Sequence, residues 1–146
     1  MIITKMLEKH VRQIAELEKL CFSDPWSENS IASELYNKLS VWLVAEIDDK
    51  VVGYVGSQTV LGETDMMNIA THPDYRNQGI ATGLINCLIN ALTDRGSHSL
   101  MLEVRASNDA AKSLYQGLGF QEVGIRRNYY RNPKEDALIL RKEWSL

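Results

Sequence analysis

The sequence predicts an α/β sandwich with a mixed sheet. Segments of β character follow one another in the first half of the chain, and they alternate with segments of helical spacing in the second half. The chain has 146 residues, ordinary apolar and charged content, and a net charge of -3, as expected for one globular domain. We therefore expect residues 1–146 to form a single domain with one sizeable core.

The first half should hold short helices between strands. Apolar side chains keep helical spacing from His10 to Cys21, and the segment 23–27 then interrupts the pattern. Ser27, with Ser30 nearby, can begin a second short helix whose apolar face extends to Leu39. The strands are predicted at residues 2–4, 41–47, 51–60 and 64–71, with a hairpin turn at residues 48–50.

Glycines end the helices predicted in the second half. Gly96 follows a long amphipathic helix that runs from Gly79 to about Arg95, and Gly119 follows a helix at residues 108–118. The remaining strands are predicted at residues 99–104, 120–125 and 137–142.

The most informative segment is NIATHPDYRNQGIAT, residues 68–82, which is predicted to be a strand end, a tight turn and a helix start. A helix start directs free backbone N–H groups and the positive end of the helix dipole to one spot. Gly79 leaves room for an anion, Ala81 keeps the next turn low, and Arg76 offers a fork of donors suited to phosphate oxygens. We interpret this segment as a pyrophosphate site, although a glycine before a helix is also a common structural feature.

A second set of polar residues follows the strand at residues 99–104. Glu103 lies near the carboxyl end of that strand, where α/β proteins open clefts, and Asn108 and Tyr115 lie two turns apart on the next helix. A carboxylate, an amide and a phenol can therefore converge on one cleft. Each residue also has a structural interpretation: Glu103 paired with Arg105 or another cation, Asn108 as a helix cap, and Tyr115 as a core residue.

Together with LEVRASNDAAKSLYQGLGF at residues 102–120, the segment at residues 68–82 resembles the GCN5-related N-acetyltransferases. The chain is similar in particular to the bacterial ribosomal-protein alanine N-acetyltransferases, through FSDPWS at residues 22–27 and RRNYY at residues 126–130. The resemblance covers nearly the whole chain. It implies a mostly antiparallel mixed sheet of about six to seven strands, flanked by about four helices.

The resemblance further implies acetyl-coenzyme A as the acetyl donor. The backbone of Ile69, Ala70 and Thr71 would contact the pantetheine arm and the acetyl group, and Asn108 would also contact the cofactor. Six successive residues would hold the pyrophosphate through their N–H groups: Asn77, Gln78, Gly79, Ile80, Ala81 and Thr82. Ala81 stands where many members carry a glycine, and alanine is common enough there that binding is still expected.

The resemblance makes Glu103 the general base and Tyr115 the general acid. These residue types suit the chemistry, because an α-ammonium with a pKa of about 8 must lose a proton before its nitrogen attacks a thioester. A tyrosine can return a proton to a departing thiolate, and a backbone N–H near Ile69 and Ala70 can meet the oxyanion. Attack should be direct, since neither Cys21 nor Cys87 has a neighbouring histidine and Cys87 is expected in the core.

On the acceptor side, Trp26, Tyr129 and Tyr130 are candidates for shaping a peptide groove, although Trp26 can equally be a packing residue. We expect residues 126–131 to form a substrate loop, and the acceptor to be the N-terminal alanine of a small-subunit ribosomal protein. Two alternatives remain: an acetyltransferase for a small amine or for other N-termini and lysines, and a non-catalytic acetyl-coenzyme A sensor.

Composition and pattern also limit other classes of function. The acidic balance disfavours a general nucleic-acid binder, and no apolar run approaches the roughly 18 residues of a membrane span. The spacing of the two cysteines indicates neither a metal site nor a disulfide framework. Because residues 1–10 lack the pattern of a signal peptide, we expect a cytoplasmic protein. We also expect the protein to act as a monomer and to use no metal.

Overall fold

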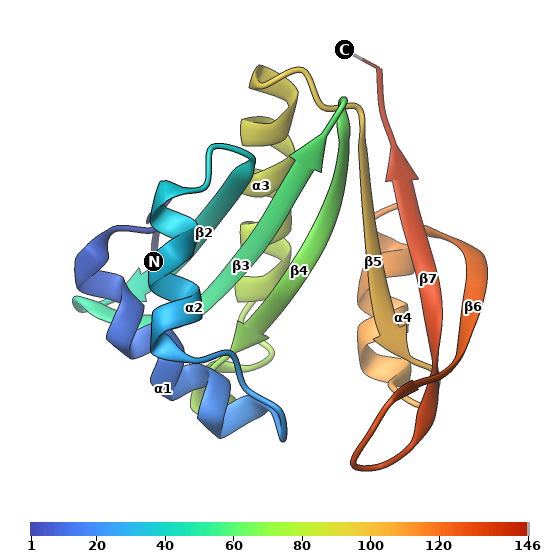
Figure 1. Ribbon diagram of the computed structural model, residues 1–146, viewed down its shortest axis with the longest axis horizontal. Helices are drawn as coiled ribbons and strands as arrows, with labels where there is room; N and C mark the ends of the chain where they lie inside the picture. Colours follow the sequence, from blue (N-terminus) through green and yellow to red (C-terminus); the bar gives the residue numbers. More distant parts are fainter. Residues whose placement is uncertain (146) are drawn as a thin grey trace.

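A computed structural model describes residues 1–145 (Figure 1). Seven strands form one sheet in the order β1-β2-β3-β4-β5-β7-β6. The strands are β1 (Ile2–Lys5), β2 (Ser40–Ile47), β3 (Lys50–Val60), β4 (Glu63–Thr71), β5 (Ser99–Arg105), β6 (Gln121–Tyr130) and β7 (Glu135–Glu143). The α-helices are α1 (Val11–Cys21), α2 (Glu28–Ser33), α3 (Ile80–Asp94) and α4 (Asp109–Gly117). Short 3₁₀ helices are η1 (Glu8–His10), η2 (Glu34–Tyr36) and η3 (Pro73–Tyr75).

Neighbouring strands are antiparallel everywhere in this sheet except between β4 and β5. The two parallel strands pair only over residues 63–65 and 99–101, and beyond this short ladder they separate (Figure 1). The predicted mixed, mostly antiparallel sheet with four flanking helices is therefore confirmed. The separation of β4 and β5 is the feature that positions the site.

Apolar side chains fill both faces of the sheet, because residues along a strand point alternately to opposite sides. On β2, Leu43 and Ala45 pack in a core with α3 and α4. Trp42 and Val44 pack instead in a second core beneath α1 and α2. In Figure 1, α1 and α2 accordingly lie in front of the sheet and α3 lies behind it.

Three expectations about individual elements are wrong. The second helix does not continue to Leu39, because α2 ends at Ser33, a 3₁₀ turn follows, and Leu39 is exposed. Residues 126–130 are not a loop, because β6 extends to Tyr130 alongside β7. Cys87 is exposed on α3, since the core face of that helix is already occupied by larger side chains such as Leu84 and Leu88.

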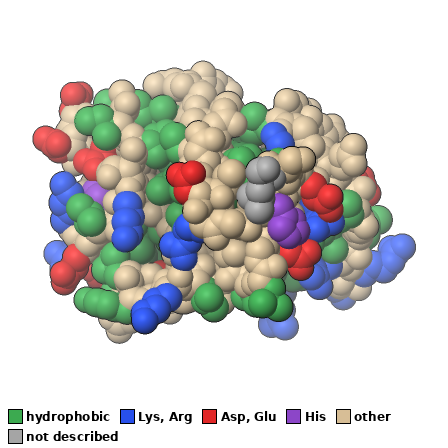
Figure 2. All heavy atoms as spheres, turned by 90° about the horizontal axis from the view of Figure 1, so that it is seen from above, with side chains coloured by type: hydrophobic (Ala, Val, Ile, Leu, Met, Phe, Trp, Pro, Cys, Tyr) green, Lys and Arg blue, Asp and Glu red, His purple; other side chains and the backbone are tan. Residues whose placement is uncertain are grey.

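The outer surface carries charges of both signs. Figure 2 views the molecule from the end where β4 and β5 meet, and its acidic and basic side chains are interspersed there. Among the helices of residues 1–145, none is both long and apolar enough to cross a membrane.

Candidate functional site

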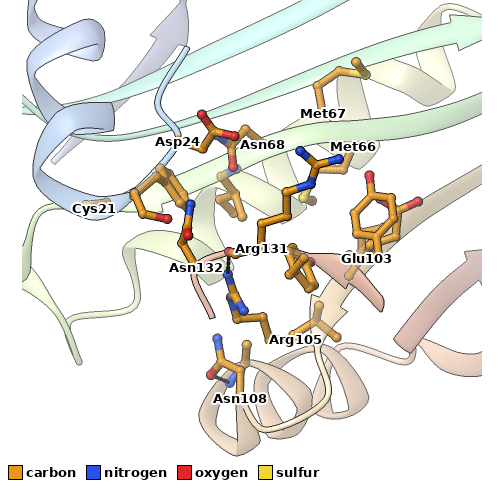
Figure 3. A pocket seen from close by; sticks show the side chains of 18 of the residues that line it. Cys21, Asp24, Met66, Met67, Asn68, Glu103, Arg105, Asn108, Arg131 and Asn132 are labelled. Carbon is orange, nitrogen blue, oxygen red and sulfur yellow. Dashed lines mark hydrogen bonds between the residues drawn. The ribbon is translucent and has the colours of Figure 1, made fainter. Parts of the chain in front are cut away.

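A cavity of about 840 Å³ opens where β4 and β5 separate. Its floor comes from residues 66–69 of β4 and residues 102–105 of β5 (Figure 3). Tyr115 of α4 and Asn108, the N-cap of that helix, also line it. Two further segments form its sides: the α1–α2 loop, residues 22–27, and the β6–β7 turn, residues 131–134. The cavity therefore exists because two strands that start as neighbours stop pairing, so that other elements close the gap.

Glu103 lies on the floor of this cavity with its side chain about one quarter exposed. The Arg126 Nε group of β6 donates to Glu103 Oε1 at 3.1 Å. The expectation that Glu103 pairs with a cation is thus confirmed, and the partner is Arg126 rather than Arg105. A carboxylate held by one guanidinium and still open to water can accept a proton from a neighbouring ammonium group.

Tyr115 reaches the same cavity from α4, and only 5% of it is exposed. Its ring packs edge-on against Phe120, and burial, followed by the proximity of Tyr130, raises its pKa to about 12. The ring is thus a core residue that also lines the cavity. Its hydroxyl keeps its proton throughout the physiological pH range.

Tyr129 and Tyr130 lie at the end of β6, and both line the cavity. The hydrogen bond and charge of Glu103, together with burial, raise the pKa of Tyr129. Burial, then the charge of Glu103, raises the pKa of Tyr130 to about 12. Both tyrosines lie on a strand instead of the expected loop.

Asn108 is the N-cap of α4 and also lines the cavity. Its side-chain oxygen accepts from the Ala111 amide at 3.1 Å, which confirms the capping interpretation. Because capping uses only the carbonyl oxygen, the amide NH₂ remains available to the cavity.

The helix-opening turn at residues 76–82 has the geometry of an anion site. Asn77 and Gly79 have left-handed backbone conformations, with φ of 62° and 76°. Gly79 is the N-cap of α3, and no atom lies within 4 Å of where its Cβ would be. Gly83 donates to the Gly79 carbonyl, so the amides of residues 80–82 precede the first helical hydrogen bond and have no intrahelical acceptor.

The backbone of β4 leads from this turn to the cavity. The His72 amide donates to the Val52 carbonyl of β3. Since amides alternate along an antiparallel strand, those of Ile69 and Thr71 point away from β3, whereas that of Ala70 points towards it. The Ile69 amide donates to Asn68 Oδ1 at 3.1 Å.

Of the predicted cofactor residues, only Ile69 and Asn108 line the cavity itself. The turn at residues 76–82 lies outside that lining and borders it at Cys21, whose thiol the Arg76 guanidinium approaches. Burial raises the pKa of the Cys21 thiol, and Arg76 acts in the opposite direction. The turn and the cavity are therefore adjacent parts of one surface.

Trp26 lies between the cavity and the second core. It lines the cavity, and its ring packs edge-on against Trp42 at a centroid distance of 5.4 Å. The backbone amide of Trp26 donates to Glu18 Oε1 at 2.8 Å. Trp26 is therefore a packing residue and a cavity residue at once.

Sequence reasoning missed two residues that hold the sides of the cavity. The first, Glu18, is buried, and burial raises its pKa to about 7 against the opposing hydrogen bond from Trp26. A recognisable signal exists, because Glu18 stands at helical spacing from Val11 and Ile14 on the buried face of α1.

Arg105 is the second missed residue, since we considered it only as a partner of Glu103. It donates to the carbonyls of Arg131 and Pro133 and pairs with Glu135, and its guanidinium lies over the Tyr130 ring at 4.4 Å. No sequence signal connects Arg105 with a turn that lies 28 positions further along the chain.

Within residues 1–145, no group of three or more histidine, cysteine, aspartate or glutamate side chains is placed to hold a metal ion.

Comparison with known proteins identifies the class to which a protein with this fold belongs, the acyltransferases. Residues 11–120 match the acetyltransferase (GNAT) family, and the chain therefore belongs to that family. Its resemblance to the family is thus confirmed.

Particular relatives share a more specific description. The chain is 41% identical over 126 residues to the ribosomal protein bS18-alanine N-acetyltransferase of Escherichia coli (strain K12), covering 85% of this chain and 84% of that protein. It is 34% identical over 142 residues to the enzyme of the same name from Haemophilus ducreyi, covering 95% and 97%. The crystal structure of the ribosomal-protein-S18-alanine N-acetyltransferase from Escherichia coli superimposes with a TM-score of 0.91, at 37% identity, over 99% of this chain and 94% of that one.

Proposed function

We propose that this protein transfers the acetyl group of acetyl-coenzyme A to the α-amine of the N-terminal alanine of a small-subunit ribosomal protein. The observation that carries the proposal is that Glu103, Tyr115 and the open edge of β4 meet at one cavity. The relatives that carry the name of this activity support the choice of acceptor. We further propose that residues 1–146 act as one acetyltransferase domain, as a monomer in the cytoplasm.

The residues fit acetyl-coenzyme A at two places. The free amides of Ile80, Ala81 and Thr82 and the open space over Gly79 suit a pyrophosphate, and Arg76 adds a positive charge. Asn77 and Gln78 belong to the same turn. The outward amides of Ile69 and Thr71 suit the carbonyl groups of a pantetheine arm, whereas Ala70 contributes its small side chain.

Acetyl-coenzyme A supplies the activated thioester. Glu103 accepts a proton from the α-ammonium, directly or through water, and the free amine nitrogen then forms its bond to the acetyl carbon. A backbone N–H of β4 near Ile69 meets the oxyanion. When the carbon–sulfur bond breaks, Tyr115 gives a proton to sulfur and is reprotonated by the second proton that nitrogen loses. The first proton, taken up by Glu103, is the one released to solvent.

The raised pKa of Tyr115 bears on this last step. A pKa of about 12 keeps the phenol protonated, as a general acid requires, but it also makes the phenol a weaker acid than free tyrosine. Proton delivery to sulfur should therefore be coupled to proton loss from the attacking nitrogen rather than precede it.

The sides of the cavity favour a peptide as acceptor. Trp26, Tyr129 and Tyr130 offer aromatic faces, and charges of both signs line the opening, including Asp24 and Arg131. A polycationic small amine would be better matched by a purely acidic rim.

The test is acetyl transfer from acetyl-coenzyme A to a panel of acceptors, read by mass. The panel holds a peptide with the N-terminal alanine of the ribosomal protein, the same peptide with a different N-terminal residue, and several small amines. We expect modification of the alanine peptide with a clear preference over the others. Modification of the small amines alone would move the protein to the small-molecule branch of the family.

A further inference from the structure

Glu18 is a buried carboxylate that the proposed chemistry does not use. Only 1% of the residue is exposed, and it belongs to the buried residues of α1 together with Ile14 and Leu17 of the second core. A carboxylate in such a place is costly unless hydrogen bonds compensate for the lost water. Its partners therefore indicate what this position gains from an acid.

Glu18 holds both ends of the α1–α2 loop. Its backbone carbonyl accepts from the Phe22 amide at 2.9 Å, and its Oε1 accepts from the Trp26 amide at 2.8 Å. Its other oxygen, Oε2, accepts from Asn68 Nδ2 of β4 at 2.6 Å. One side chain thus joins the loop that forms one side of the cavity to the strand that forms its floor.

The hydrogen bonds continue through Asn68 to the site of reaction. Asn68 Oδ1 accepts from the Ile69 amide, so an unbroken chain runs from the Trp26 amide through Glu18 and Asn68 to Ile69. Both ends of this chain are backbone donors. With a donor at each end, two amides would leave one donor facing another, whereas one carboxylate and one amide satisfy every contact.

We propose that Glu18 is a positioning residue for the acceptor: through the Trp26 amide and Asn68, it holds the α1–α2 loop at the distance from β4 that admits the peptide N-terminus. The proposal rests on the proposed function, in that the α1–α2 loop is taken as a wall of the acceptor site. Glu18 is not among the residues that line the cavity, and its effect passes through the loop and Asn68.

The donor and acceptor directions along this series of hydrogen bonds can be tested by swapping the two side-chain groups. In Glu18→Gln, the new side-chain amide faces the amide of Asn68, donor against donor. In Asn68→Asp, measured at a pH where both groups are ionised, two carboxylates face each other. In the double variant Glu18→Gln with Asn68→Asp, the introduced glutamine accepts from the Trp26 amide and donates to the introduced carboxylate, which still accepts from Ile69. Every contact is then restored with the groups exchanged.

For each single variant we expect the KM for the alanine peptide to rise about tenfold, because the loop then occupies its binding position only part of the time. The double variant should return to within about threefold of the original protein, since its loop is held again. For Glu18→Gln, the Kd of acetyl-coenzyme A should change by less than about twofold, because Glu18 does not line the cavity and the turn at residues 76–82 is untouched. The control is Glu46→Gln, which removes another largely buried carboxylate, the partner of His10, that lies away from the cavity.

Hydrogen exchange of the Trp26 amide gives a readout that needs no substrate. Protection should fall in both single variants and recover in the double variant. Unchanged protection in the single variants would overturn the proposal whatever the activity. A lower Tm with an unchanged peptide KM in the single variants would also overturn the proposal. The same holds if the peptide KM of the double variant is no lower than that of the worse single variant. If the original protein did not acetylate the peptide at all, the proposed acceptor would be wrong. Hydrogen exchange of the Trp26 amide, together with the KM for the amine that the protein does acetylate, would still decide the role of Glu18.

Discussion

Glu103 and Tyr115 lie at the same cavity in opposite environments. Glu103 is partly open to water and is held by Arg126, whereas Tyr115 is almost fully buried against Phe120. A base that receives a proton from a substrate benefits from access, and an acid that must stay protonated benefits from burial. The two environments therefore fit the two roles proposed for them.

Replacing Glu103 with glutamine should lower kcat by about 10²-fold or more, because an amide cannot accept the ammonium proton. The Kd of acetyl-coenzyme A, measured by calorimetry, should be unaffected, since Glu103 is not among the residues proposed to hold it. Glu63→Gln is the matched control: Glu63 also pairs with an arginine, Arg141, but does not line the cavity. A Glu103→Gln variant with near-normal kcat would remove Glu103 from the mechanism.

Replacing Tyr115 with phenylalanine should also lower kcat by about 10²-fold, with little change in Tm, because the ring and its packing are kept. Single-turnover kinetics should place the loss in the chemical step. A matched control is Tyr130→Phe, which removes a neighbouring hydroxyl with a similarly raised pKa. Loss of rate in Tyr130→Phe but not in Tyr115→Phe would mean that Tyr130, and not Tyr115, is the acid.

At the scale of elements, the two motifs of the site lie near each other because β4 and β5 start as neighbours and then separate. The motif before α3 and the motif between β5 and α4 are each local in sequence, and each was predicted as the structure has it. Their adjacency depends on β4 and β5 being neighbours, as the short parallel ladder makes them.

Gly79 allows a test of the α3 turn. Gly79→Ala should lower stability by about 1 kcal/mol, because alanine is strained in the left-handed region. It should also raise the Kd of acetyl-coenzyme A about tenfold, because the new methyl group occupies the open space over the amides. The control is Gly96→Ala at the other end of α3, where φ is 84° and space is equally open. If both variants bound acetyl-coenzyme A normally, the turn would not be the pyrophosphate site.

The wrong expectation for residues 126–130 and the missed role of Arg105 share one physical cause. Residues 126–130 carry polar and charged side chains, so no alternation marked them as a strand, and their pairing with β7 decides their conformation. Arg105 likewise acts on a turn far away in sequence. A local sequence pattern predicts an element when the side chains of that element determine its conformation. The pattern fails where a partner distant in sequence determines the conformation.

The whole molecule has a core on each face of its sheet, and Glu18 lies in the core that supports the acceptor side. Its folded pKa of about 7 lies above its ordinary value of 4.5. The folded protein therefore binds this proton more tightly than the unfolded chain does. The contribution of Glu18 to stability is thus largest at low pH, and it decreases as the pH rises from about 4.5 to about 7.

The difference in unfolding free energy between the original protein and Glu18→Gln should accordingly vary with pH in that window. Because all other groups titrate alike in both proteins, the difference isolates Glu18. Urea titrations at intervals from about pH 5 to about pH 8 should show the original protein losing stability relative to the variant up to about pH 7, and a constant difference above it. A difference independent of pH would mean that Glu18 titrates normally.

The proposed acceptor and the groove proposed to receive it depend on acetylation of a free alanine N-terminus at the cavity between β4 and β5. The most direct measurement is acetyl transfer to a matched pair of peptides, one with a free N-terminal alanine and one with that amine blocked but a lysine present, with the modified atom located by fragmentation mass spectrometry. We expect a single acetyl group on the alanine nitrogen of the free peptide and none on the blocked one. Acetylation of the lysine in both peptides, with the alanine nitrogen unmodified, would contradict the proposed function.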